Sequence, residues 1–348
     1  MNRYQETIAD FSYAFGKPPF KGVIKDQPED FIVQELMPHE PSGEGEHFWL
    51  DLSKRGLSTE RVAKALARYA GAAYRDVGYA GMKDVHAVTR QWFSVWLPKK
   101  PELDWADFAL DGVTVHSINK HNRKLKRGAH SGNRFEIVIR DFGGDIAELE
   151  ERLAQVARLG VPNYFGNQRF GRDAGNLAKA EDWFSGSFKI KDRTLKGIVL
   201  SSARSFLFNL VVSTRIDDDS WCSLKKNEPA GLNGSNAIFA SKEEKDNNHR
   251  LQALDIHPTA PLWGRGMQKA TEDYPELADL ESRAMSEYSL FHDGLESRGL
   301  EYQRRSIRCI PQELKMTAKE SHVVLNFSLQ SGQFATSLIR ELIDVESE

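Results

Sequence analysis

The sequence is most informative between positions 78 and 93, which read Gly78-Tyr79-Ala80-Gly81-Met82-Lys83-Asp84-Val85-His86-Ala87-Val88-Thr89-Arg90-Gln91-Trp92-Phe93. Asp84 is the only carboxylate in this stretch, and an alternating aromatic run follows it directly. Short loops at the rim of a sheet commonly hold catalytic side chains, because the flanking strands fix them while the loop stays accessible. An isolated carboxylate beside cations stays ionised and can act as a nucleophile or a base. The same residues also suit an ordinary turn, in which Asp84 bonds its own backbone.

Composition limits the classes of protein to consider. The chain has 348 residues, which predicts two domains rather than one core. Its net charge of −3 and isoelectric point near 6.4 do not by themselves indicate nucleic-acid binding. We see no apolar run of membrane-spanning length and no secretory signal at the N-terminus. The two cysteines, Cys222 and Cys309, are far apart without metal-ligand spacing, so we expect a reducing cytoplasm and no metal site.

The first 160 residues have the pattern of an α+β domain. Alternating or apolar runs predict strands at 31–36, 48–52, 91–97 and 135–140. Ser58 and Asp145 are predicted to cap two amphipathic helices, which end near Gly71 and Gly160. Hairpin-like pairs of strands recur, so we expect a mixed or mainly antiparallel sheet with helices on one face.

From residue 161 to residue 310 helical patterns dominate. They cover residues 174–185, 201–216, 243–254 and 275–300, and Gly/Pro-rich connectors are expected at 227–235 and 257–266. A strand then returns at 323–327, followed by a helix with Phe334, Leu338 and Leu342 on one side. One strand and one short helix cannot bury enough apolar surface to fold alone. We therefore expect them to dock onto the earlier sheet, with a mostly helical insertion between the two ends of the chain.

Several kinds of catalytic motif are absent from the sequence. There is no phosphate-binding loop, dinucleotide fingerprint, zinc-protease helix, Cys-x-x-Cys pair or nucleophile elbow. What remains is carboxylate chemistry, together with a basic run from Lys120 to Gly128 that holds five Lys or Arg and no acid. Such a run is either a solvated loop or a phosphate contact. Aromatic residues at strand ends suit either a core boundary or the stacking of an unstacked base.

These features appear together, in order, in a known family. The matching pieces are Pro28-Glu29-Asp30-Phe31, Gly43-Glu44-Gly45-Glu46-His47, Gly81-Met82-Lys83-Asp84 with His86-Ala87-Val88-Thr89, Arg123-Lys124-Leu125 with Gly128, Gly132-Asn133-Arg134-Phe135, residues 161–171, Phe334-Ala335-Thr336-Ser337 and Arg340-Glu341-Leu342. This ordered set resembles the TruD-type tRNA pseudouridine synthases over nearly the whole chain. The segment from about 216 to 304 matches least.

The resemblance implies a fold and an activity. The fold is a pseudouridine-synthase core with a mixed, mainly antiparallel sheet, formed by residues 1–160 and 311–348, and a mostly helical insertion (TRUD) domain at 161–310. The implied activity is the isomerisation of a uridine, typically uridine 13 in the D stem of tRNA, to pseudouridine. That enzyme needs no cofactor. We expect tRNA as the partner, no membrane, no obligate protein partner, a monomer and a cytoplasmic location.

The resemblance also assigns roles to residues. Asp84 matches the catalytic aspartate, and Phe31, Asn133 and Phe334 match residues that contact the target nucleotide. Phe135 occupies the stacking position where other pseudouridine synthases carry Tyr. The remaining assignments are Lys25 as the basic residue near the carboxylate, and Arg123, Lys124, Lys126, Arg127 and Arg169 as contacts to the RNA backbone.

The expected mechanism begins with an ionised Asp84 beneath ribose C1′. It either bonds to the sugar or helps to form a glycal. Lys25, or less favourably Lys83, would keep the carboxylate ionised by charge pairing, and Asn133 could bond both Asp84 and the nucleotide. Two other functions fit the same residues: a non-catalytic RNA-binding protein, and a glycosidase-like hydrolase that pairs Asp84 with Glu29 or Asp30.

Overall fold

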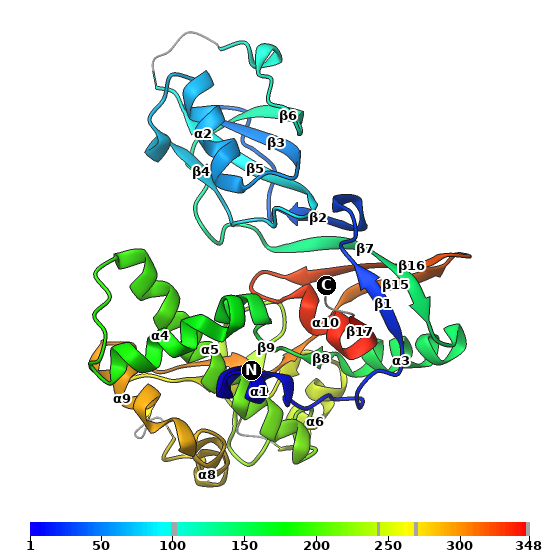
Figure 1. Ribbon diagram of the computed structural model, residues 1–348, viewed down its shortest axis with the longest axis vertical. Coiled ribbons are helices and arrows are strands. Elements are labelled where there is room, and N and C mark those ends of the chain that lie inside the picture. The colour runs from blue at the N-terminus through cyan, green and yellow to red at the C-terminus, as the bar shows by residue number, and fades with distance from the viewer. Residues whose placement is uncertain (99–102, 242–243, 268–270, 346–348) are drawn as a thin grey trace. The chain divides into compact units, whose positions relative to one another are not determined.

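The computed structural model describes residues 1–98, 103–241, 244–267 and 271–345. By its internal contacts the chain forms two compact units, and each combines segments that are far apart in sequence (Figure 1). The sheet unit comprises Pro19–Glu150, Pro311–Gly332 and Ile343–Glu348, and the helical unit comprises Met1–Pro18, Glu151–Ile310 and Gln333–Leu342. Two parts of the predictions lie outside the described residues. They are position 243, which begins the helix predicted at 243–254, and positions 346–348 of the predicted core.

The sheet unit is built on a ten-stranded sheet with the main order β15-β16-β7-β2-β5-β3-β6. Strand β1 pairs with β7 and β17, and β4 pairs with β5. The β2–β5 and β1–β17 pairs are parallel, and the other pairs in this sheet are antiparallel, as predicted. The strands are β1 Lys21–Ile24, β2 Phe31–Leu36, β3 His47–Arg55, β4 Val77–Tyr79, β5 Val88–Trp96, β6 Val113–His121, β7 Gly132–Gly143, β15 Gln312–Ala318, β16 His322–Gln330 and β17 Asp344–Val345.

Alternation along β3 and β5 creates the core of this unit. Leu50 and Leu52 of β3 lie opposite Phe93 and Gln91 of β5, so their side chains share one face. Helix α2 (Thr59–Tyr69) covers that face with Val62 and Leu66. Its N-terminus is capped by Ser58, whose side chain accepts a hydrogen bond from the N–H of Arg61, which confirms the predicted cap.

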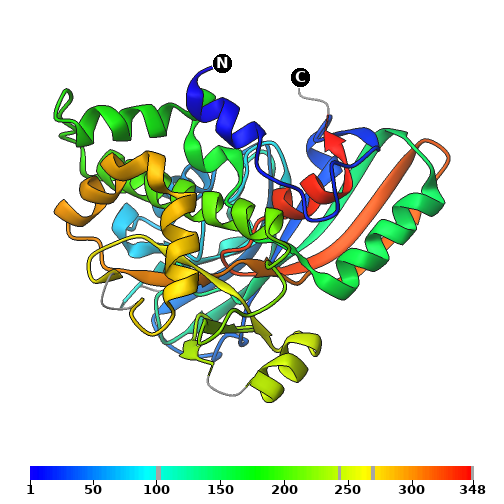
Figure 2. The same ribbon diagram turned by 90° about the horizontal axis from the view of Figure 1, so that it is seen from below.

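The C-terminal strand docks onto the N-terminal half of the sheet, as expected. Strand β16 pairs with β7 without interruption from His322 opposite Arg140 to Gln330 opposite Gly132. Figure 2 shows the orange-red β15–β16 hairpin beside β7. Helix α10 (Ala335–Leu342), by contrast, belongs to the helical unit, where the Ser337 hydroxyl donates to the carbonyl of Tyr164 at 2.7 Å.

The helical unit is centred on the 25-residue helix α5, Arg193–Asp217. The remaining elements that lie wholly or mainly in this unit are α1 Arg3–Ala9, α3 Ile146–Leu159, α4 Gly175–Phe184, α6 Glu244–Gln252, α8 Pro275–Ala284, α9 Ser289–Ser297, β8 Val161–Pro162, β9 Pro229–Leu232, β10 Ile238–Ala240, β11 Ile256–His257, β12 Thr259–Leu262, β13 Gln303–Ser306 and β14 Arg308–Cys309. Asp145 accepts a hydrogen bond from the N–H of Ala147 at the start of α3.

One expectation about hydrophobicity was wrong. Helix α5 is long and apolar enough to cross a membrane by length and composition, with a mean hydropathy of 1.4 in its most apolar window. Fully buried residues such as Phe206, Phe208 and Val212 place it in the core of the helical unit, and a buried core helix passes the same test. The apolar character of this helix is hard to see in the sequence, because polar residues such as Ser201, Ser202 and Arg204 interrupt the apolar run of α5.

Two predicted features of the central segment were also wrong. The connectors at 227–235 and 257–266 contain the strands β9, β11 and β12, and the predicted helix 275–300 is broken into α8 and α9. A buried ion pair explains why the connectors are ordered. The Arg215 guanidinium lies 3.0 Å from Glu228 Oε1, and this oxygen also accepts the N–H of Thr259 at 2.9 Å. The pair therefore ties both connectors to α5.

The buried pair predicts a large effect on stability. Replacing Glu228 with Gln leaves the Arg215 charge buried without its partner, so we expect a loss of about 3–5 kcal/mol in the free energy of unfolding. The control, Arg250→Met, removes a partly exposed pair with Asp255 and should cost under about 1 kcal/mol. Urea denaturation of both variants measures the difference. Equal losses would contradict a structural role for the buried pair.

Candidate active site

Asp84 lies in the loop between β4 and β5, and it satisfies both interpretations of the sequence. One carboxylate oxygen, Oδ1, accepts the N–H of His86 at 3.1 Å, which is the expected turn. The other, Oδ2, forms an ion pair with the ammonium of Lys25. The Asp84 side chain is 30% exposed, so the carboxylate remains open to a ligand while two partners hold it.

Lys25 reaches Asp84 from the segment that follows β1. Its backbone has a positive φ of 62°, a conformation that a non-glycine residue adopts only under constraint from its surroundings. Its ammonium also lies 4.3 Å from the centre of the Phe31 ring. Lys25 therefore joins the carboxylate to the aromatic residue that begins β2.

The ion pair decides the protonation state of the carboxylate. Partial burial raises the pKa of Asp84, but the hydrogen bond and the charge of Lys25 outweigh burial and lower the pKa below its ordinary value. Asp84 is thus ionised at neutral pH. Of the two lysines considered from the sequence, the structure selects Lys25 as its partner.

Lys83, the other candidate, has a different partner. Its ammonium lies 2.7 Å from Glu35 Oε1 on β2, and both side chains are buried. The backbone N–H of Lys83 donates to the Thr59 hydroxyl at 3.0 Å. Burial raises the pKa of Glu35, and the charge of Lys83 opposes that rise. Lys83 therefore anchors the loop to the sheet and to α2.

Lys54 is a functional candidate that the sequence analysis missed. Its ammonium is buried and donates to two carbonyls, at 2.7 Å to Leu57 and at 2.8 Å to Asp84. Burial lowers the pKa of Lys54 to about 8, and the negative charge of Asp84 partly opposes this shift. The signal was present in β3, because Lys54 continues the alternation of Leu50 and Leu52 onto the buried face.

The three expected nucleotide contacts of the sheet unit share one face of the sheet. Phe135 lies opposite Val33 in the register of β7 with β2, so Asn133 lies opposite Glu35 and Ile137 lies opposite Phe31. Directly paired residues project to the same side. The rings of Phe31 and Phe135 meet edge to face with their centres 6.2 Å apart.

Two details of this face differ from the sequence-based expectation. No hydrogen bond joins Asn133 to Asp84 in the described part of the chain, and the buried Asn133 Oδ1 is without a hydrogen-bond partner there. Phe135 is only 7% exposed, since Phe327 of β16 stacks on it with ring centres 5.1 Å apart. Asn133 thus has an unused acceptor, and one side of the Phe135 ring is already covered.

Phe334 and Arg169 belong to the helical unit, where they lie together. The Arg169 guanidinium is 5.8 Å from the centre of the Phe334 ring and 5.5 Å from that of Phe165, and it donates to the Ser201 hydroxyl at 3.2 Å. Burial lowers the pKa of Arg169. This cation is therefore half-buried among aromatic rings, and its predicted contact with the RNA backbone stays a prediction.

The remaining expected RNA contacts form a basic loop, Arg123–Arg127, after β6. Arg123, Lys126 and Arg127 are exposed, and Lys124 is half-buried, with its ammonium bonded to the carbonyl of Arg75. Arg127 donates to the Tyr79 hydroxyl at 3.1 Å and lies over its ring. The loop is thus charged and also attached to β4.

The two carboxylates considered for glycosidase chemistry are engaged elsewhere. Glu29 pairs with Arg55, and the buried Asp30 accepts two hydrogen bonds of 2.8 Å from Arg140. The hydrogen bond from Arg55 lowers the pKa of Glu29, and for Asp30 the bonds from Arg140 outweigh burial, so that pKa is also lowered. A glycosidase acid needs a raised pKa to hold its proton, so neither residue suits that role.

A family model, two relatives and a solved structure that resemble this chain all carry the same family name. The family model for tRNA pseudouridine synthase D (TruD) matches residues 8–179 and 174–342. A tRNA pseudouridine synthase D from Methylococcus capsulatus is 42% identical over 97% of this chain and 96% of its own length, and one from Hydrogenovibrio crunogenus is 37% identical over 98% of each. A crystal structure from Methanosarcina mazei, described as TruD, has a TM-score of 0.73 at 19% identity and covers 99% of both chains.

The fold and these matches define the chain as an RNA pseudouridine synthase, the enzyme class expected from the sequence. Within that class it belongs to the tRNA pseudouridine synthase D (TruD) family. The α+β fold with its mixed, mainly antiparallel sheet is likewise confirmed.

Removing Lys25 should change how activity depends on pH. In Lys25→Met, Asp84 loses the strongest influence that opposes its partial burial, so its pKa rises and the carboxylate becomes protonated at a higher pH. We expect the acid limb of kcat/KM to move up by roughly one to three pH units, as measured by tritium release from 5-labelled uridine in tRNA between pH 4.5 and 8. Lys64→Met, on the exposed side of α2, is the control. An unshifted acid limb would argue against the ion pair.

Removing Lys54 should test its role as a positioning residue for Asp84. The Lys54→Met variant leaves the carbonyls of Leu57 and Asp84 without their buried donor, which loosens the loop. We expect kcat to fall at least tenfold while KM changes less than threefold, because Asp84 loses its fixed position while the residues of the sheet face stay in place. Circular dichroism checks that the variant is folded. A parallel rise in KM with kcat intact would show a purely structural role.

Proposed function

We propose that this chain converts uridine 13 in the D stem of tRNA to pseudouridine, with Asp84 as the catalytic carboxylate. The observation that carries the proposal is the state of Asp84, which is an ionised and partly exposed carboxylate. It forms an ion pair with Lys25, and the ammonium of Lys54 donates to the backbone carbonyl of Asp84. Membership of the family supports the class of reaction. The position in tRNA and the role of Asp84 follow from the sequence resemblance described above.

The reaction exchanges one bond for another within the same nucleoside. The C1′–N1 bond breaks and its electron pair leaves on uracil N1; the base turns, and C5 bonds to C1′. Asp84 acts while the C1′–N1 bond breaks, in one of two ways: a carboxylate oxygen attacks C1′ and is later displaced by C5, or it removes the ribose C2′ proton to form a glycal and later returns that proton. The C5 proton is lost and N1 gains one. The atoms of substrate and product are the same, so the overall change requires no oxidant or reductant.

The sheet face beside Asp84 supplies groups that suit the detached base. The unpartnered Oδ1 of Asn133 can accept the N3–H of uracil, which would satisfy a buried acceptor that is otherwise unpaired. The edge of Phe31 and the remaining side of Phe135 can pack on the ring, and Phe334 is assigned a nucleotide contact from the helical unit. Holding the base is essential, because its escape would leave an abasic site.

The target uridine must leave its helix before Asp84 can reach C1′. This costs a few kcal/mol, repaid by stacking and phosphate contacts. We assign the phosphate contacts to Arg123, Lys124, Lys126 and Arg127, and include Arg169 from the expected insertion domain at 161–310. The proposal includes a cytoplasmic location, action as a monomer and independence from membranes.

The decisive experiment compares wild type with Asp84→Asn, which keeps the size of the side chain but removes its charge. Wild type should release tritium from 5-labelled uridine in tRNA and produce pseudouridine at position 13 alone. Asp84→Asn should lose at least 1,000-fold in rate, because a neutral amide oxygen can neither attack C1′ nor remove a proton as a carboxylate does (about 4 kcal/mol in the barrier), while the variant still binds tRNA. Asp111→Asn, at an exposed turn of the sheet unit, is the matched control.

Three outcomes would overturn the proposal. Full activity in Asp84→Asn would move the chemistry to another residue. Binding of tRNA without tritium release by wild type would favour a non-catalytic RNA-binding protein. Free uracil among the products would favour hydrolysis. Pseudouridine at a different position would contradict only the assignment of uridine 13.

A further inference from the structure

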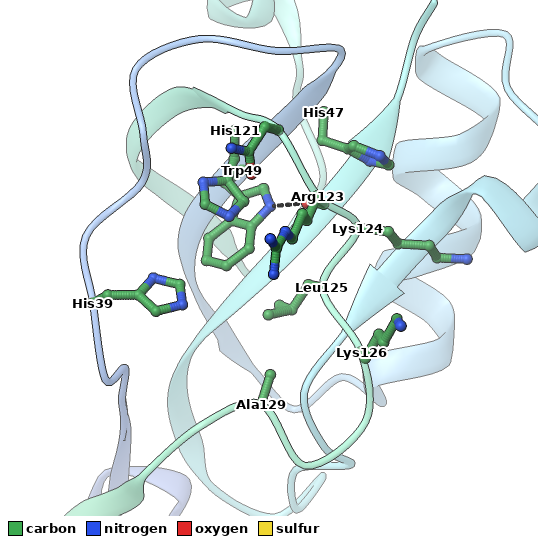
Figure 3. Close-up of a pocket in the computed structure, with 10 residues that line it drawn as sticks. His39, His47, Trp49, His121, Arg123, Lys124, Leu125, Lys126 and Ala129 are labelled. Atoms are coloured by element: carbon green, nitrogen blue, oxygen red, sulfur yellow. Dashed lines mark hydrogen bonds between the residues drawn. The ribbon is translucent and has the colours of Figure 1, made fainter.

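A recess lies beside the basic loop, and the roles assigned above leave most of the residues that line this recess unexplained. It has a cavity volume of about 460 Å³, within the range of pockets that hold small ligands. Figure 3 shows that the residues come from the loop before β3, from β3 itself and from the end of β6 with the basic loop. The lining residues are His39, His47, Trp49, His121, Asn122, Arg123, Lys124, Leu125, Lys126 and Ala129.

This recess, which we call the histidine pocket, is separate from the candidate active site. His47 and Trp49 occupy odd positions of β3, whereas Lys54, which holds the Asp84 loop, occupies an even one. Successive side chains of a strand point to opposite faces of the sheet. The histidine pocket therefore opens on the other face, and a ligand bound there would not occupy the site of the reacting nucleoside.

The basic loop at this pocket is held in one conformation. The Trp49 indole N–H donates to the carbonyl of Arg123 at 2.9 Å (Figure 3), and the N–H of Leu125 donates to the Ser94 hydroxyl at 2.9 Å. Gly78 allows close approach, because a Cβ at that position would lie 2.3 Å from the carbonyl oxygen of Leu125. A merely solvated charged loop needs no such anchoring. The backbone from which the cations extend is thus anchored to the sheet.

The charge of the pocket selects an anion. Arg123, Lys124 and Lys126 line it, and no Asp or Glu is among the ten lining residues. Arg123 and Lys126 are exposed, so their charged groups are available to a ligand. Fixed cations without a counter-charge are the usual environment of a nucleic-acid phosphate.

The imidazoles add a second kind of contact. Burial is the main cause that lowers the pKa of His47, and the positive charge of Lys124 lowers it further. Burial also lowers the pKa of His121, with smaller contributions from His39 and Arg123. Both rings are therefore neutral at neutral pH and act as flat, polar surfaces rather than as charges. His121 Nδ1 accepts the N–H of Ser42 at 3.0 Å, which puts its proton on Nε2.

Two of the histidines have unused capacity. His47 Nδ1 is buried and has no hydrogen-bond partner among the described residues. His39 is exposed, and its ring lies nearly parallel to that of His121, at 19° with centres 5.7 Å apart. The unpaired Nδ1 of His47 is a polar atom that could form a hydrogen bond. The exposed ring of His39, which stacks on the ring of His121, suits a heterocyclic base that stacks.

We infer that the histidine pocket binds one unpaired nucleotide of the RNA substrate, at a distance from the uridine that reacts. Arg123 and Lys126 hold its phosphate, and its base packs on the exposed ring of His39, while His47 lies at the opposite end of the pocket (Figure 3). A lone phosphate would leave the rings unused, and an acidic peptide has no base to stack. The inference rests on the proposed function for its choice of RNA, and it adds a second point of recognition to that function.

Binding of tRNA tests the pocket without any turnover. We use the Asp84→Asn protein as background and measure its affinity for a tRNA transcript by fluorescence anisotropy at several KCl concentrations. His39→Ala and His47→Ala should each weaken binding at least fivefold, and His47→Ala should leave the salt dependence unchanged because that ring is neutral. Arg123→Ala should weaken binding and also reduce the slope of log K against log salt by about one. His116→Ala, an exposed histidine of β6 outside the pocket, should have no effect.

A second measurement identifies the ligand. Histidine resonances of the labelled protein are followed by NMR on addition of UMP, GMP, inorganic phosphate or polyglutamate. UMP or GMP should shift the His39 and His47 signals at a concentration at least tenfold below that needed for phosphate. Equal effects of nucleotide and phosphate, stronger effects of polyglutamate, or unchanged tRNA affinity in His39→Ala would each overturn the inference. Nucleotide binding together with absent tritium release would instead contradict the proposed function alone.

Discussion

The ion pair between Lys25 and Asp84 is the interaction on which the candidate active site depends. A carboxylate that is partly removed from water tends to take up a proton, and a protonated Asp84 could neither attack a sugar carbon nor remove a proton. The ammonium of Lys25 reverses that tendency. The protein accepts an unusual backbone conformation at Lys25 in order to place this charge, and the same ammonium also contacts Phe31. Lys25 therefore sets the charge of Asp84 and also contacts Phe31, which is the residue that begins β2.

Buried lysines determine where the carboxylate lies. Lys83 pairs with Glu35 beneath the loop, and Lys54 donates to the carbonyl of Asp84 itself. Burying a charged group is costly unless it is well paired or hydrogen-bonded, so these contacts are weak evidence for stability. They are better explained as a means of fixing a loop that would otherwise move. A rate that depends on the alignment of one oxygen with one carbon benefits from such a fixed loop.

The same principle recurs elsewhere in the chain. In the helical unit the buried pair of Arg215 and Glu228 orders two Gly/Pro-rich segments that would otherwise be loops. In the sheet unit, a hydrogen bond from Trp49 and one from Leu125 anchor the backbone of the basic loop, from which its cations extend. In each case a polar contact within the fold gives a defined position to a segment whose composition alone indicates flexibility.

The sequence by itself determined the features that local patterns encode. Alternating or apolar runs identified strands such as β2, β5 and β16, Ser58 marked the start of α2, and the absence of any other carboxylate between residues 78 and 93 drew attention to Asp84. The family resemblance favoured Lys25 over the adjacent Lys83 as the partner of Asp84, and the tertiary structure shows that pair, which spans 59 positions of the chain. The tertiary structure alone showed the contact from Lys54, the Asn133 amide oxygen that is unpaired among the described residues, the strands within the predicted connectors and the break between α8 and α9. All of these depend on which residues meet across the fold, and periodicity within a segment carries no information about its partners.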